Sequence, residues 1–253
     1  MLAQKIFVTG GSRGIGLAIV ETLLGQGHSV ASFSRSVTTE LQALNDKYPE
    51  TLLITQGDLT DADTSTAALN RFIATFNGLD SLILNGASPG PVKRMADVTL
   101  SEFTEVYAAN VLSILPLYHA ALPSLRTSKG RLIALSSGAS ENAFEASGPY
   151  AGTKAAVNRI IQVLGHEEPD VTFIAVNPGL VKTDMSAAVL AGSAHAMKPE
   201  THEHIKAAFA AGMALPPAVP AEAIAALALR APKVLSGRYI TSFGPEAKAL
   251  LEG

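Results

Sequence analysis

The stretch VTGGSRGIG, residues 8–16, follows a short apolar run and opens a segment with helical spacing. Its glycines suit separate tasks there: a tight turn, close approach of backbone N–H groups to a pyrophosphate, and close packing of the helix on the strand. The positive end of the helix dipole favours an anion at the same point. Because the strand–turn–helix context is present, the stretch predicts a dinucleotide site in preference to a merely flexible turn. The candidate binding residues in it are Gly10, Ser12, Arg13, Gly14, Ile15 and Gly16.

Beyond this stretch, short runs of large apolar residues alternate with segments in which the apolar residues have helical spacing. The runs cover residues 5–10, 29–34, 51–56, 79–86, 130–137, 171–176 and 237–242, and the helical segments cover 14–27, 41–48, 61–76, 101–125 and 150–166. Nearly continuous apolar strands that alternate with helices predict a parallel sheet covered on both faces. Without an internal repeat or linker, residues 1–253 are predicted to form one α/β domain, a Rossmann fold with a doubly wound, seven-stranded parallel sheet.

Residues 186–217 differ from this alternation. They are rich in alanine, contain Met197 and Met213, and lead into the Pro-rich stretch LPPAVP at residues 215–220. This composition favours two short helices over another strand–helix unit. From its position in the chain, the segment is predicted to be a small helical lid over the substrate.

The bulk composition limits the classes of function. The chain is 47% hydrophobic and 16% charged with a formal charge of −3, which argues against a nucleic-acid partner or an anionic membrane surface. It has no cysteine, which fits a cytoplasmic protein. No apolar stretch is long enough to predict a membrane span. No metal site is predicted either, because the spacing of two between His202 and His204 points them apart on a helix.

The end of the second predicted strand bears on the choice of coenzyme. An NAD site usually presents an acidic residue there to the adenosine ribose, whereas this chain has Ser34 and Arg35 in the sequence SFSRS. Arg13 in the glycine loop could face the same place. Two guanidinium groups and a hydroxyl suit a 2′-phosphate, which predicts NADP(H), although both arginines could instead be solvated.

Tyr150 and Lys154 stand four residues apart in SGPYAGTKAA, residues 147–156. Residues at this spacing share one helix face, so the ammonium group can reach the region of the phenol. One interpretation is an ordinary amphipathic helix. The other is catalytic: the charge of Lys154, together with that of an oxidised nicotinamide, would lower the pKa of Tyr150 from near 10 towards neutrality.

With its glycine spacing T-G-x-x-x-G-x-G, the chain resembles the short-chain dehydrogenase/reductase family over nearly its whole length. GDLTD (57–61), LNGAS (84–88), AANVLS (108–113), LSSGAS (135–140), YAGTK (150–154) and NPGLVKT (177–183) are similar to that family's motifs. LNGAS departs from the common Asn-Asn-Ala-Gly at Gly86 and Ser88. The resemblance implies a catalytic group of Asn110, Ser137, Tyr150 and Lys154. It also implies cofactor contacts at Asp58, Leu59, Asn85, Gly86, Ala87, Asn110, Tyr150, Lys154, Pro178, Gly179, Val181 and Thr183.

These residue types also make chemical sense for reducing a carbonyl group. Tyr150 would donate the proton, and Ser137 would hydrogen-bond the substrate oxygen where negative charge develops. Lys154 would bond the nicotinamide ribose, and Asn110 would hold a water that links Lys154 to solvent. All four residues occur in this order and spacing after a dinucleotide-binding turn, which favours an enzyme over a non-catalytic NADP(H) sensor.

The substrate is less determined. Pocket residues are expected at Ser88, Pro89, Ser137, Phe144, Tyr150, Leu180, Met185 and Met213, a mainly apolar set that suits an uncharged small-molecule carbonyl compound. The run from SSGAS to the late SGRYI resembles the sepiapterin-reductase-like branch, and especially the benzil reductases that form (S)-benzoin from an aromatic 1,2-diketone. A general ketone or aldehyde reductase and a 3-oxoacyl reductase stay open. The family resemblance also implies a homodimer or homotetramer.

Overall fold

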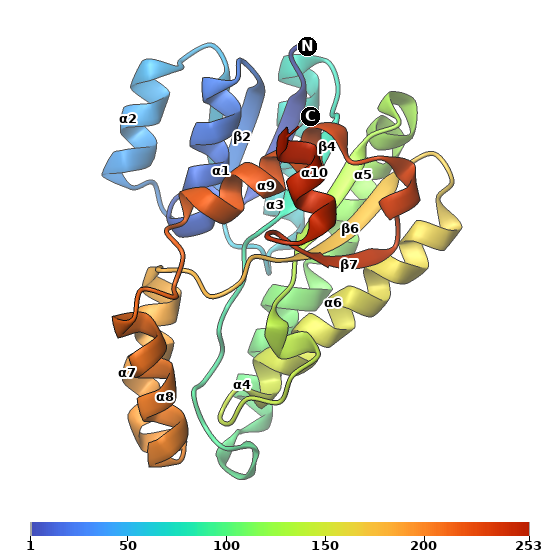
Figure 1. The fold of residues 1–253 in the computed structure, drawn as a ribbon. Coiled ribbons are helices and arrows are strands. Elements are labelled where there is room, and N and C mark those ends of the chain that lie inside the picture. The colour runs from blue at the N-terminus through green and yellow to red at the C-terminus, as the bar shows by residue number, and fades with distance from the viewer. Residues whose placement is uncertain (1, 253) are drawn as a thin grey trace.

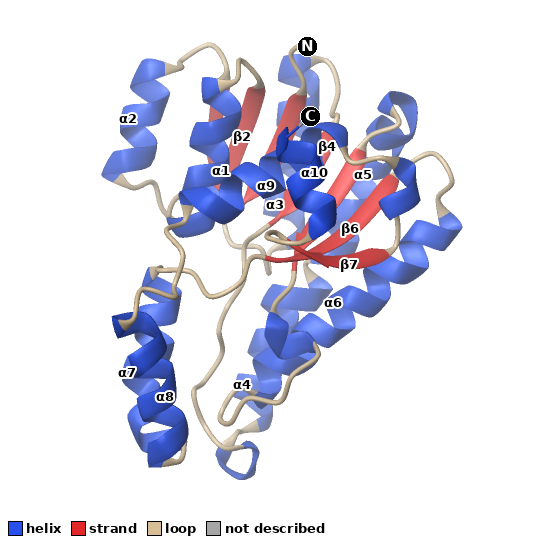
Figure 2. Cartoon of the chain, in the orientation of Figure 1, coloured by secondary structure: helices blue, strands red, loops and turns tan. Residues whose placement is uncertain are grey.

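The computed structural model describes residues 2–252 and contains one seven-stranded sheet (Figures 1 and 2). All neighbouring strands are parallel and their order is β3-β2-β1-β4-β5-β6-β7. The predicted doubly wound α/β sheet is confirmed. The strands are β1 (Lys5–Thr9), β2 (Ser29–Ser34), β3 (Leu52–Gln56), β4 (Ser81–Leu84), β5 (Arg131–Leu135), β6 (Thr172–Asn177) and β7 (Arg238–Thr241).

Helices cover both faces of the sheet, as its apolar strands require. The helices of the Rossmann unit are α1 (Gly14–Gly25), α2 (Thr39–Lys47), α3 (Ala62–Phe76), α4 (Leu100–Tyr107), α5 (Ile114–Ser128), α6 (Gly148–Glu167), α9 (Ala218–Arg230) and α10 (Pro245–Glu252). The alternation within β1 illustrates the layering. Ile6 and Val8 pack in one core with α1 and α9, whereas Phe7 packs in the other with α3 and α5. Burial on both faces therefore explains why these strands are apolar throughout.

The segment predicted as one helix over residues 101–125 is broken in the middle. It consists of α4, a π-helical segment at Ala108–Leu112, and α5, which ends three residues later than predicted. The whole stretch Leu100–Ser128 is long and apolar enough, by length and composition, to cross a membrane. Core helices meet the same criterion, and here α5 packs against α3 while the π segment packs against α6.

Two further helices, α7 (Asp184–Ala196) and α8 (Pro199–Ala210), form a hairpin that projects from the sheet domain at the lower left of Figure 1. Thr183 caps α7 through its hydroxyl, which accepts a hydrogen bond from the Ser186 amide at 3.2 Å. The far end of the hairpin is tied to the rest of the chain. Glu145 accepts a 2.8 Å hydrogen bond from the Lys198 amide, and the Arg94 Nε donates to the Ala196 carbonyl at 3.4 Å.

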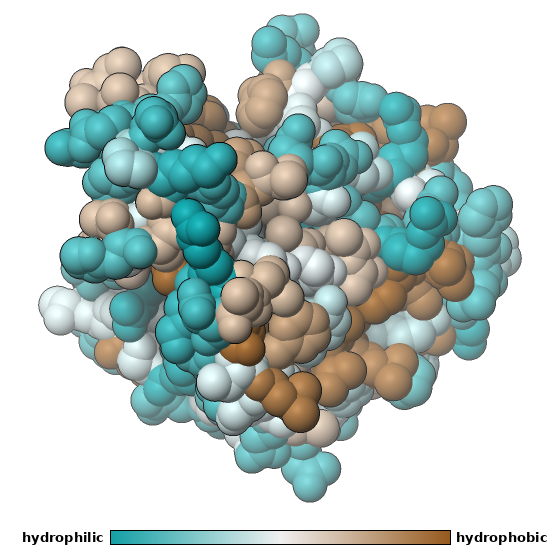
Figure 3. Space-filling model, turned by 90° about the horizontal axis from the view of Figure 1, so that it is seen from below, coloured by the Kyte–Doolittle hydropathy of each residue, from teal (hydrophilic) through white to brown (hydrophobic). Residues whose placement is uncertain are grey.

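The face seen from below in Figure 1 includes this hairpin and α4. In the space-filling view of that face, hydrophobic side chains gather in brown patches beside a hydrophilic strip (Figure 3). The large exposed apolar side chains of the loops and helices at this end include Met95, Leu100, Phe144 and Met213. The end of the molecule that carries the carboxyl ends of the strands thus exposes several large apolar side chains.

Candidate active site

A cleft of about 660 Å³ lies along the carboxyl ends of the central strands. In an open parallel α/β sheet, ligands bind at this edge, where the strand order reverses. Here the reversal falls between β1 and β4. Most of the predicted cofactor residues line the cleft, namely Gly10, Ser12, Arg13, Gly14, Ile15, Gly16, Ser34, Arg35, Asp58, Leu59, Asn85, Gly86, Ala87, Tyr150, Lys154, Pro178 and Thr183.

The first turn needs glycine for geometric reasons. Gly10 has φ +68°, and a Cβ there would lie 2.7 Å from the Gly86 Cα. At Gly16 a Cβ would lie 2.1 Å from the Gly10 carbonyl oxygen. Asn85 braces the same turn, since its side-chain amide donates to the carbonyls of Thr9 and Gly10 at 2.9 and 3.0 Å. The loop is therefore held in one shape with its backbone facing the cleft.

At one end of the cleft, two arginines and two hydroxyls gather after β2. Arg35 and Ser34 line this end, and Arg13 reaches across to it, donating from its Nη2 to the Ser36 hydroxyl at 3.2 Å. Arg13 also forms an ion pair with Asp184 at the start of α7, with 3.6 Å between Nη1 and Oδ2. Both side chains of this pair are largely exposed, so the guanidinium remains available to a ligand.

Asp58 lies on the same side of the cleft, after β3. Its carboxylate accepts hydrogen bonds from the Thr60 amide at 2.8 Å and from the Thr60 hydroxyl at 2.7 Å. These bonds lower the pKa of Asp58 and fix the loop that follows β3. The adjacent Leu59 also lines the cleft.

Tyr150 and Lys154 lie further along the cleft, on the first turns of α6. Pro149 in the first turn of α6 suits a helix start, because its missing N–H would be unpaired there in any case. The Lys154 side chain is buried, its Nζ donates to the Leu135 carbonyl at 2.7 Å, and it lies 5.6 Å from the centre of the Tyr150 ring. Burial lowers the pKa of Lys154 to about 8.

The expected effect of Lys154 on Tyr150 is not what the protein groups alone produce. Burial raises the pKa of Tyr150, and the nearby Ser137 hydroxyl offsets only part of that rise. A buried phenolate loses its hydration, and this cost outweighs the attraction of nearby charge on the protein. Any net lowering of this pKa would therefore require a further positive charge beside the phenol.

Asn110 lies in the π segment and is almost fully buried. Its Oδ1 accepts from the Ser88 amide at 2.7 Å, while its Nδ2 donates to the Ser88 carbonyl at 2.8 Å and to the Thr153 hydroxyl at 3.1 Å. One amide donor thus holds the loop after β4 and the other holds Thr153 on α6. A small cavity of about 10 Å³, room for about one water, lies beside Asn110, Ser113 and Lys154.

Several predicted residues lie outside the lining of the cleft. Val181 is buried and pairs with Leu215 in an isolated bridge, while a Cβ on Gly179 would face Phe243. The Ser137 hydroxyl oxygen accepts a hydrogen bond from the Ala139 amide at 3.1 Å, away from the cleft lining. Of the predicted substrate pocket, Ser88, Pro89, Tyr150 and Met185 line the cleft, whereas Ser137, Phe144, Leu180 and Met213 do not.

Other residues line the cleft without having been predicted. Ser36, Gly57, Thr60, Ala109 and Ser136 lie inside the quoted motifs beside residues that were predicted, and Asp184 directly follows the motif that ends at Thr183. Glu105 comes from the middle of a helical segment, where no motif marks it. Away from the cleft, His202 Nδ1 shares a 2.9 Å hydrogen bond with the Ser193 hydroxyl. Within residues 2–252, no group of three or more His, Asp or Glu side chains gathers as metal ligands would.

The shape and chemistry of the cleft fit a dinucleotide. The glycine turn lines the cleft where the first helix begins, and two arginines stand at one end. At the other end Lys154 is a buried ammonium with three donors, of which the Leu135 carbonyl takes one. Donors that are buried without partners are costly, so a ligand with several hydroxyl groups, such as a ribose, is a fitting occupant.

Comparisons with known proteins agree with this geometry. The sequence model of the short chain dehydrogenase family matches residues 4–194. An uncharacterized oxidoreductase of Schizosaccharomyces pombe is 35% identical over 94% of this chain and 96% of its own length. The benzil reductase ((S)-benzoin forming) of Saccharomyces cerevisiae is 28% identical over 94% of this chain and 95% of its own. The crystal structure of a short chain dehydrogenase/reductase from S. cerevisiae superposes with a TM-score of 0.94 at 30% identity, covering 98% of this chain and 99% of the other.

Proposed function

The chain belongs to the short-chain dehydrogenase/reductase family, and from this premise we propose that it is an NADPH-dependent carbonyl reductase. The observation that carries the proposal is the position of Tyr150 and Lys154. They stand one helical turn apart on α6 and line the same cleft as the glycine turn. A proton donor and a buried ammonium thus lie at the end of a dinucleotide-shaped cleft opposite the arginines.

In the proposed reaction the alcohol forms by addition of a hydride to the carbonyl carbon and of a proton to the oxygen. The bound coenzyme supplies the hydride and, once oxidised, a positive charge beside the phenol. Tyr150 donates its hydroxyl proton to the substrate oxygen, and Ser137 stabilises the charge that develops there. Lys154 orients the coenzyme ribose and returns a proton towards Tyr150. The cavity beside Lys154 gives that proton a route through one water.

The choice of NADP(H) over NAD(H) rests on Arg13 and Arg35. A 2′-phosphate carries charge and several acceptor oxygens, which guanidinium groups bind well. The hydroxyls of Ser34 and Ser36 provide further donors at this end of the cleft. Asp184 already neutralises part of the charge of Arg13, but the exposure of that pair makes it a weak competitor.

For the substrate we propose an aromatic 1,2-diketone reduced in the manner of benzil to (S)-benzoin. The similarity to the yeast benzil reductase and the uncharged lining of Pro89, Ala109 and Met185 support this choice. A general ketone or aldehyde reductase and a 3-oxoacyl reductase are the alternatives within the family. A non-catalytic NADP(H) sensor is disfavoured because the Tyr–Lys pair is intact. We also propose that the protein is cytoplasmic and that it assembles into a homodimer or homotetramer.

The test is NADPH oxidation followed by absorbance, with benzil, aliphatic diketones, sepiapterin and simple aldehydes as substrates. Tyr150→Phe should lower kcat at least about a hundredfold because it removes the proton donor, while NADPH affinity stays within about threefold. Tyr107→Phe on α4 is the matched control and should keep the wild-type rate. A fully active Tyr150→Phe variant would contradict the mechanism.

The same assay run with NADH tests the coenzyme choice. We expect NADPH to be preferred, and the double variant Arg13→Ala/Arg35→Ala should weaken NADPH binding by about a hundredfold while leaving NADH binding nearly unchanged. Equal use of NADH and NADPH by the wild-type protein would reject the role given to the two arginines.

A further inference from the structure

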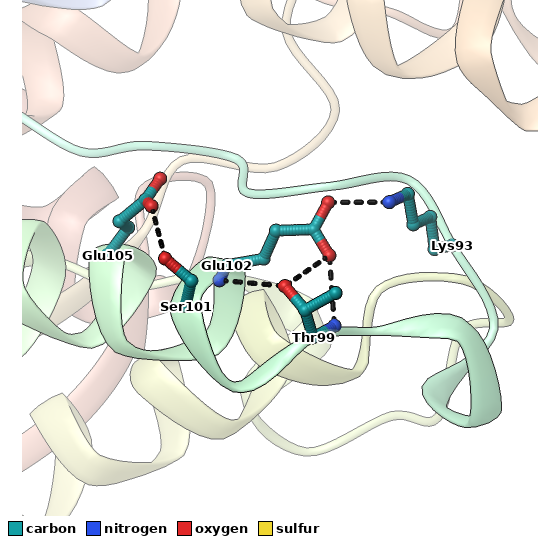
Figure 4. A network of polar contacts seen from close by, with 5 residues as sticks. All are labelled: Lys93, Thr99, Ser101, Glu102 and Glu105. Carbon is teal, nitrogen blue, oxygen red and sulfur yellow. Dashed lines mark hydrogen bonds and ion pairs between the residues drawn. The ribbon is translucent and has the colours of Figure 1, made fainter.

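A carboxylate that no motif marks lines the cleft on the side of α4. Glu105 lies on this helix four residues before Ala109, which lines the cleft as well. The Ser101 hydroxyl donates to Glu105 Oε1 at 3.0 Å and holds the side chain (Figure 4). In the described part of the chain, Oε2 takes no hydrogen bond, so one oxygen remains available to a ligand.

The nearest cation does not neutralise Glu105. Lys93 is bound to Glu102, with 2.5 Å between Nζ and Oε1, and Figure 4 shows the lysine reaching that residue and not Glu105. Glu102 is further fixed by the capping box of α4, in which its carboxylate accepts from the Thr99 amide at 3.0 Å. Within residues 2–252, the charge of Glu105 is therefore left without a salt-bridge partner.

The charges that line the cleft are thus divided between its two ends. Arg13 and Arg35 stand at the end beyond β2, and Lys154 is buried against the Leu135 carbonyl. The carboxylates of Asp58 and Asp184 also line the cleft near the arginines. Asp184 is paired with Arg13, and Asp58 accepts two hydrogen bonds from Thr60. On the side of α4, next to Ser88, Pro89 and Ala109, Glu105 is the charged residue of the lining. The part of the cleft that remains for a substrate carries a negative charge in otherwise uncharged surroundings.

We propose that Glu105 determines substrate preference, favouring carbonyl compounds that carry a protonated amine away from the reacting carbonyl and disfavouring those that carry a carboxylate. The inference rests on the proposed reductase function and narrows its substrate class. An exposed pair of opposite charges changes an equilibrium constant by up to about fivefold, and a like-charge pair does so in the opposite sense. Because the two effects multiply, the upper bound on the ratio between a cationic and an anionic substrate is about 25-fold, and we expect about tenfold.

The experiment compares three aryl 1,2-diketones of similar size that bear a para-aminomethyl, para-ethyl or para-carboxylate group. Their kcat/KM values with NADPH are measured for the wild type, Glu105→Gln and the control Glu222→Gln. Glu222 is exposed on α9 and lies outside the cleft lining, so its replacement removes the same net charge elsewhere. Wild type and Glu222→Gln should prefer the cationic diketone to the anionic one by about tenfold.

Glu105→Gln should reduce that ratio about fivefold, through KM, while kcat/KM for the neutral diketone stays within about twofold. Added salt at 0.5 M should also reduce the wild-type preference for the cationic over the anionic diketone, because it screens the charges. An unchanged ratio in Glu105→Gln, with the neutral diketone still reduced, would overturn the inference and leave the reductase function standing. If the wild type reduced none of the three, the proposed function would fail and this inference with it.

Discussion

Lys154 lowers the stability of the fold through its buried charge, although the proposed function requires that charge. Its ammonium is 4% exposed and burial lowers its pKa from the usual 10.5 to about 8. Because the folded-state pKa is below the unfolded one, the unfolded chain binds more protons between about pH 8 and 10.5. Stability therefore rises with pH through this window, and at neutral pH the buried charge costs about 3 kcal/mol.

Replacing Lys154 by methionine should accordingly stabilise the protein while removing activity. Methionine fills a similar volume and needs no proton, but the bond to the Leu135 carbonyl is lost. We expect the free energy of unfolding to rise by about 1–2 kcal/mol at pH 7. The gain should fall to zero and change sign towards pH 10.5, where the buried amine is neutral and only the lost bond to Leu135 counts. Urea unfolding of both proteins at pH 7 and 10 measures this. A variant that is less stable than the wild type at pH 7 would refute it.

For single residues, the sequence predicts which side chains lie close together better than it predicts their pKa values. The spacing of Tyr150 and Lys154 is local, so their shared helix face follows from helix geometry. The pKa of Tyr150 depends instead on how much water the surrounding elements exclude, and none of that is visible in a window of five residues. Glu105 was missed for a related reason: it lines the cleft from within α4, and only the packing of elements distant in sequence brings that helix face to the cleft.

At the scale of elements, the π segment at Ala108–Leu112 was missed by the helical prediction over residues 101–125. The segment itself contains neither proline nor glycine, but Pro116 lies four residues after Leu112 and has no N–H to donate to the Leu112 carbonyl, so the sequence does carry a local signal for a break. Tertiary contacts add to this local cause. Asn110 turns inward to pair with the Ser88 backbone, and π segments are frequently found at functional sites.

Asn110→Leu should show how much this clamp contributes. The change leaves the Ser88 N–H and C=O groups without their partner and removes the bond to Thr153. We expect a loss of about 2–4 kcal/mol in the free energy of unfolding, measured in urea. Thr153→Val removes one of these bonds together with its own bond to the Tyr150 carbonyl and should cost about half as much. A loss below about 1 kcal/mol for Asn110→Leu would mean that the clamp is dispensable.

For the whole molecule, the sheet and its layers follow from the sequence because short apolar strands alternate with helical segments, which indicates a doubly covered parallel sheet. Which apolar side chains are exposed at the surface could not be predicted from the sequence and is seen only in the structure. On the α5 side, Leu112 and Leu115 are 62% and 57% exposed one turn apart, and Val163 on α6 is 44% exposed. Leucines this exposed on a helix that is also buried against the sheet indicate a second, external contact.

We therefore expect the α5 and α6 faces to pair with a second copy of the chain. A stable interface needs about 800 Å² from each partner, and a charge placed at its centre is strongly destabilising. Leu115→Arg should thus convert the expected dimer or tetramer into a smaller species, as seen by sedimentation equilibrium. The control Val234→Arg changes an 80% exposed residue of the short helix Lys233–Leu235 and should leave the mass unchanged. A wild-type protein that sediments as a monomer at micromolar concentration would exclude this assembly, and the exposed leucines would then need another partner.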